Sequence, residues 1–200
     1  MTSDPSGDPP DRGAADGESA DRVGVGPGAA IDEAGGVPPA DRAAVAAQLG
    51  RAPRAMRAVA HRCPCGLPDV VETSPRLPDG TPFPTLYYLT CPRASSAIGR
   101  LEASRVMRQM ADRLRTDPAL AEDYRRAHEA YLARRQELGD VPEIAGISAG
   151  GMPTRVKCLH ALLAHALAAG PGVNPLGDEA RAEIEPWWAD GPCVSTQEAT

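Results

Sequence analysis

The tripeptide Pro78-Asp79-Gly80 lies between two segments that have the composition of β-strands. Segments 69–73 (DVVET) and 83–90 (FPTLYYLT) are rich in β-branched and aromatic residues, which favour strands. Pro, Asp and Gly each favour a turn for a separate physical reason. The sequence therefore predicts an antiparallel hairpin. If its loop is centred near Asp79–Gly80, Cys91 lies opposite about Leu67–Pro68.

Three cysteines meet at one end of this predicted hairpin. Cys63 and Cys65 directly precede the first strand, and Cys91 follows the second. The Cys63-Pro64-Cys65-Gly66 run has the tight, glycine-bearing form of a metal-binding knuckle, and gathered thiolates suit zinc or an iron–sulfur cluster. A fourth ligand is expected from the segment Lys157-Cys158-Leu159-His160. The predicted metal ligands are Cys63, Cys91, Cys158 and His160, with Cys65, His165 and His61 in reserve.

Helix geometry limits how Cys158 and His160 can act together. The apolar spacing predicts a helix over 154–169, and positions two apart in a regular helix point about 200° apart. The two side chains can then share one ion only if the helix starts later than Thr154, with Cys158 in its first turn.

Two other interpretations of the cysteines stay open. Buried free cysteine is common and inert, so the thiols can be plain core residues. Alternatively, Cys158 is a nucleophile or redox group at a helix start, with Lys157 and His160 beside it. Three classes of function follow. They are an accessory or binding protein that holds zinc or a cluster, an enzyme of hydrolase or redox type that uses Cys158 or a metal-bound water, and a metal-free adaptor for a protein partner.

The rest of the chain predicts an α+β domain. We expect a helix over 41–49 ended by Gly50, a strand over 56–62, and a bent helix over 92–114. Asp117 is expected to cap a helix that carries a stripe of apolar residues and ends at Gly139. The predicted fold is a small antiparallel sheet of two or three strands, with one clear hairpin, packed against about four helices.

Composition sets the boundaries of the domain and excludes several classes. Residues 1–40 are mostly Pro, Gly, Asp and Ala, so we expect a disordered tail before a domain over 41–185 and a short tail over 186–200. A net charge of −6 argues against general nucleic-acid binding. No apolar run approaches the roughly 20 residues of a membrane span. Without a visible export signal, the five cysteines predict a cytoplasmic protein with thiols rather than disulfides.

Three stretches resemble a known family. They are QLGRAPRAMRAVAHRCPCGLPDVVET, LPDGTPFPTLYYLTCPRASSAIGRLEA and TRVKCLHALLAHALAAGPGVNPLGD. They resemble the mainly actinobacterial family known as domain of unknown function 501, over about residues 45 to 180. The resemblance implies a cytoplasmic bacterial protein without an established activity, and its gene neighbourhood implies a link to cell division or polyphosphate metabolism. Features typical of the family fall at Cys63, Gly66, Pro68, Thr90, Cys91, Pro92, Lys157, Cys158, His160, His165, Asn174, Pro175 and Gly177. Cys65 departs from the family pattern, which favours Cys63, Cys91, Cys158 and a histidine as the metal ligands.

Overall fold

The computed structural model describes residues 36–195, so the predicted disorder of the tail lies almost entirely outside the described residues. The fold is α+β, as predicted. Three antiparallel strands form one sheet in the order β1-β2-β3, namely β1 (Met56–Arg62), β2 (Pro68–Thr73) and β3 (Tyr87–Leu89). The described chain contains six α-helices, which is more than the four or so expected. They are α1 (Pro39–Leu49), α2 (Pro92–Glu102), α3 (Val106–Thr116), α4 (Pro118–Glu137), α5 (Leu159–Ala169) and α6 (Pro175–Ile184), with a 3-10 turn η1 (Pro142–Ile144).

The hairpin has the predicted register. Val70 pairs with Leu89 and Val71 with Tyr88, and the Thr90 N–H donates to the Asp69 carbonyl at 2.8 Å. Cys91, the next residue, therefore lies opposite Pro68. The second strand is shorter than predicted because Pro82 and Pro84 have no N–H to donate to a ladder.

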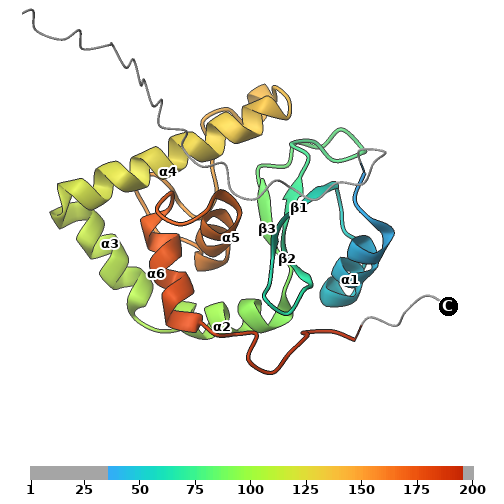
Figure 1. Ribbon diagram of the computed structural model, residues 1–200. Coiled ribbons are helices and arrows are strands. Elements are labelled where there is room, and N and C mark those ends of the chain that lie inside the picture. The colour runs from blue at the N-terminus through green and yellow to red at the C-terminus, as the bar shows by residue number, and fades with distance from the viewer. Residues whose placement is uncertain (1–35, 196–200) are drawn as a thin grey trace, which may run out of the picture.

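The sheet is buried on both faces. Every residue of β2 is buried. Val71 packs on one face with Val45 of α1 and Val59 of β1, whereas Val70 packs on the other face in the main core with α5. Figure 1 shows α1 and α5 on opposite sides of the sheet. Helix α5 is thus the centre of the molecule, packed against the sheet on one side and against α6 on the other.

The sequence predicted α4 correctly, but the helix predicted over 92–114 is divided in two. Asp117 caps α4 as expected, accepting from the Ala119 and Leu120 N–H groups at 3.0 and 3.1 Å. The stripe of α4 is buried, and its Tyr131 hydroxyl accepts from the Leu86 N–H at 2.5 Å. The predicted helix over 92–114 is two helices, and at the break the Ser104 hydroxyl donates to the Leu101 carbonyl at the end of α2 and accepts from the Val106 N–H at the start of α3.

The C-terminal region packs on the domain. Helix α6 was not predicted, although Asn174 and Pro175 are good N-cap and N1 residues. Trp187 is buried and stacks edge-on against Trp188, so this pair docks on the domain. Within the described residues, no helix is both long enough and apolar enough to cross a membrane.

Candidate metal centre

Three side chains from two helices meet at the junction of α2 and α5. Glu102 is the last residue of α2, Cys158 precedes α5 as its N-cap, and His160 lies in the first turn of α5. One ligand atom from each side chain lies within 4.8 Å of the other two, and this is the only such group of three or more His, Cys, Asp or Glu residues among residues 36–195. All three side chains are partly buried.

Glu102 holds the start of α5 in place. Its Oε1 accepts hydrogen bonds from the Leu159 N–H at 2.5 Å and the His160 N–H at 3.3 Å. The first N–H groups of a helix have no partner within the helix, and a carboxylate beside them is stabilised by the helix dipole. The Cys158 side chain makes no capping hydrogen bond, so Glu102 takes the capping role from another helix.

The His160 ring is oriented by two acceptors. Its Nε2 lies 3.1 Å from the Ser95 carbonyl oxygen, and its Nδ1 lies 3.1 Å from Glu102 Oε1. A carbonyl can only accept, so Nε2 carries a proton. Nδ1 faces a carboxylate oxygen, which is also an acceptor, so this contact is favourable with a proton on Nδ1 or with a cation between the two atoms.

The acidities of the other two groups differ in direction. Burial raises the pKa of the Cys158 thiol, and the negative charge of Glu102 adds to this, although the N–H groups of Ala161 and His160 act the other way. Burial also opposes ionisation of Glu102, but hydrogen bonds from His160 and from the α5 N–H groups together hold its pKa below the ordinary value. The resting site is therefore a carboxylate beside a protonated thiol.

Cys158 and His160 converge because α5 starts later than the sequence predicted. Helix α5 begins at Leu159 instead of Thr154, and Cys158 is extended with φ −155° and ψ 110°. The preceding residues fold back on a glycine loop, in which the Gly150 carbonyl accepts from the Lys157 N–H at 2.7 Å. A Cβ on Gly151 would lie 2.6 Å from the Arg155 carbonyl oxygen, so this loop requires glycine.

The cysteines of the hairpin lie elsewhere. Cys63 and Cys91 are both buried in the main core, and neither belongs to the group with Cys158. Cys91 precedes α2 whereas Glu102 ends it, a separation of about 16 Å along the helix axis. Burial raises the pKa of both thiols to about 12, with a neighbouring thiol contributing in each case, Cys65 beside Cys63 and Cys193 beside Cys91.

The reserve histidines have other partners, and Lys157 does not join the group. His165 is buried, and its Nδ1 lies 3.2 Å from the Asn174 side-chain amide. His61 Nδ1 lies 2.7 Å from the Asp69 carboxylate. Lys157 is exposed. His165 and His61 therefore lie outside the group of three.

Glu102 was not predicted as a site residue. Glu102 is far from Cys158 along the chain, and only the packing of α2 on α5 brings them together. Two carboxylates on the hairpin have other partners. Glu72 is buried between Arg57 and Arg134, and Asp79 accepts from the Thr81 N–H within its turn.

Comparison with known proteins identifies one family. The model described as "Protein of unknown function (DUF501)" matches residues 59–182. This range contains all three residues of the candidate metal centre. No curated protein and no solved structure matches the chain.

Proposed function

This chain belongs to the DUF501 family of proteins of unknown function, and we propose that it is an accessory protein that binds one zinc ion through Glu102, Cys158 and His160. The three donors are a carboxylate oxygen, a thiol sulfur and an imidazole nitrogen, which are the ligand types that zinc takes in proteins. Ligand atoms around a tetrahedral zinc lie about 3.6 Å apart. The observed spacing within 4.8 Å needs only a small contraction.

The orientation of His160 carries the proposal. A histidine that ligates a metal usually donates its other ring N–H to a carbonyl or carboxylate. His160 already donates from Nε2 to the Ser95 carbonyl, and its Nδ1 faces Glu102. A cation between Nδ1 and the carboxylate resolves the contact between two acceptors. A proton on Nδ1 would resolve it as well, and the experiment below separates the two.

The donor set favours zinc over the alternatives. Iron–sulfur clusters are held mainly by cysteine thiolates, and this group contains one thiol. A nucleophilic cysteine needs a lowered pKa, whereas that of Cys158 is raised. Zinc overcomes a raised thiol pKa because it binds the thiolate and releases the proton.

A second candidate function is catalysis by a metal-bound water. Catalytic zinc sites have three protein ligands and leave one position for water. The side chains of His160 and Glu102 are 31% and 25% exposed, so water could reach a metal ion held by these residues. The same three residues serve both functions, and the chemistry of the fourth position distinguishes them.

The test is the zinc affinity of the full chain, measured by titration against a competing chelator. We expect one zinc ion per chain. Glu102→Gln, Cys158→Ser and His160→Gln should each weaken zinc binding about 100-fold, because each removes one of three ligands. Cys193→Ser is the matched control, since Cys193 lies outside the group, and it should bind zinc like the wild type.

Two further variants examine the ligand set that the sequence predicted. If Cys63 and Cys91 are ligands, Cys63→Ser and Cys91→Ser should lose zinc as Cys158→Ser does. If the centre is Glu102, Cys158 and His160, both should retain it. A wild-type chain that takes up no zinc would contradict the proposal.

A further inference from the structure

Arg135 is a buried cation that has no carboxylate partner in the described part of the chain. It lies in the last turn of α4, and its residue is 6% exposed. Among the described residues, its guanidinium donates only to backbone carbonyls, those of Pro84, Ile144 and Ile147. No salt bridge to Arg135 occurs within residues 36–195. Burial lowers its pKa, which reflects the free-energy cost of a buried charge that lacks a counter-ion.

The guanidinium has two donors left over. Arginine offers five N–H groups. Nη1 donates to Pro84 and Ile147, and Nη2 donates to Ile144. This leaves Nε–H and one Nη2–H without a protein acceptor in the described chain. The edge of a guanidinium formed by Nε–H and the adjacent Nη2–H is one that binds carboxylates bidentately.

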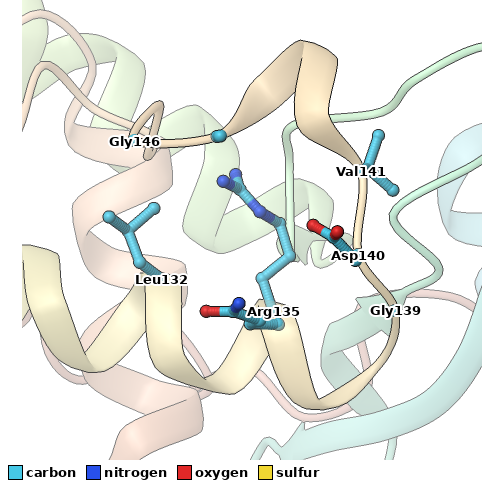
Figure 2. Close-up of a pocket in the computed structure, with 8 residues that line it drawn as sticks. Leu132, Arg135, Gly139, Asp140, Val141 and Gly146 are labelled. Carbon is cyan, nitrogen blue, oxygen red and sulfur yellow. The ribbon is translucent and has the colours of Figure 1, made fainter.

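A cavity lies beside this arginine. It has a volume of about 120 Å³ and is formed by the end of α4 and the loop that follows, with Leu132, Gln136, Asp140, Val141 and Gly146 in its wall. Figure 2 shows the guanidinium reaching from α4 toward the loop at Gly146, with Asp140 and Val141 on the far side of the cavity. The cavity has room for a carboxylate and a short carbon chain.

We propose that this cavity binds the carboxylate group of a small organic acid, held bidentately by Nε and Nη2 of Arg135. The anion supplies the counter-charge that the buried guanidinium lacks. Leu132 and Val141 give the cavity apolar walls for a short aliphatic chain. Asp140 adds a negative charge to the wall, and this repels a phosphate dianion more strongly than a carboxylate monoanion. The site is separate from Glu102, Cys158 and His160 and does not depend on zinc.

The experiment is a titration of the full chain with sodium acetate, with sodium chloride at equal ionic strength as the control. The readout is the ¹H–¹⁵N NMR signal of the arginine Nε–H groups. Arg135→Lys identifies the Arg135 signal, since it is the one that this variant lacks. Acetate should shift this signal downfield in a saturable way, while chloride leaves it in place. Inorganic phosphate should bind several-fold more weakly than acetate.

A second variant keeps the proposal testable if Arg135→Lys fails to fold. Asp140 is exposed and forms no salt bridge within residues 36–195, so Asp140→Asn should fold like the wild type. It should bind acetate about three-fold more tightly, because it removes a like charge near the site. An Arg135 signal that acetate and chloride move equally would overturn the proposal. So would tighter binding of phosphate than of acetate, or an unchanged acetate affinity in Asp140→Asn.

Discussion

Gly177→Ala is expected to lower the free energy of unfolding by about 3 kcal/mol, near the upper end of what overpacking costs. Gly177 lies in the first turn of α6, where that helix crosses α5. A Cβ at this position would lie 2.3 Å from the Leu162 carbonyl oxygen and 2.7 Å from the Ala166 Cβ. The first of these contacts is with backbone inside α5, so a helix must move to relieve it. The melting temperature should fall by roughly 6–12 °C in a domain of this size.

Gly99→Ala is the matched control for this prediction. Gly99 lies inside α2, and a Cβ there would meet nothing within 4 Å. Alanine should stabilise this helix by about 0.5–1 kcal/mol, since it restricts the unfolded chain. Urea unfolding of both variants checks the pair. A Gly177→Ala variant as stable as Gly99→Ala would mean that α5 and α6 are not in the close contact described above.

Acid is expected to destabilise the fold through His165. This side chain is buried among Tyr87, Tyr131 and Asn174, and burial lowers its pKa from 6.5 to about 4. The unfolded chain therefore binds a proton at a higher pH than the folded chain does. Stability is fully present above pH 6.5 and is lost as pH falls toward 4. The loss is up to about 3 kcal/mol, because each pKa unit is worth about 1.4 kcal/mol.

The measurement is the free energy of unfolding in urea at pH 7 and pH 4.5. His165→Gln keeps an acceptor for the Asn174 amide but cannot bind the proton, so it should be less stable at pH 7 and lose less on acidification. His128→Gln is the comparison, since His128 is only partly buried; burial lowers its pKa as well, and we expect this variant to change the acid loss less than His165→Gln does. The same acid loss in the wild type and in His165→Gln would assign the pH dependence to other groups.

Local chemistry predicted the sheet and one long helix well. The turn at Pro78-Asp79-Gly80 set the register that brings Val70 opposite Leu89, and Asp117 marked the start of α4. Both features depend on residues close together in sequence. The end of α2 and the start of α5 depend instead on contacts between distant segments, and there the predicted boundaries failed.

In the candidate site, too, the residues marked by local sequence were predicted and the residue that depends on a distant contact was not. Cys158 and His160 could be found from sequence because both are rare, chemically distinctive residues within three positions. Glu102 could not be found, because one of many carboxylates becomes a capping group only when α2 meets α5. The strand register that places Cys91 opposite Pro68 was a sound deduction from strand pairing. Strand pairing alone could not predict that Cys193, from the C-terminal segment, lies beside Cys91.

The shortness of β3 bears on how copies of this chain behave toward each other. An edge strand exposes unpaired N–H and C=O groups that can recruit a strand from another molecule. Here the strand is only three residues long, and Pro82 and Pro84 precede it. The Pro84 carbonyl is already taken by the Tyr131 hydroxyl and by Arg135. We therefore expect the β3 edge to resist strand pairing with another molecule.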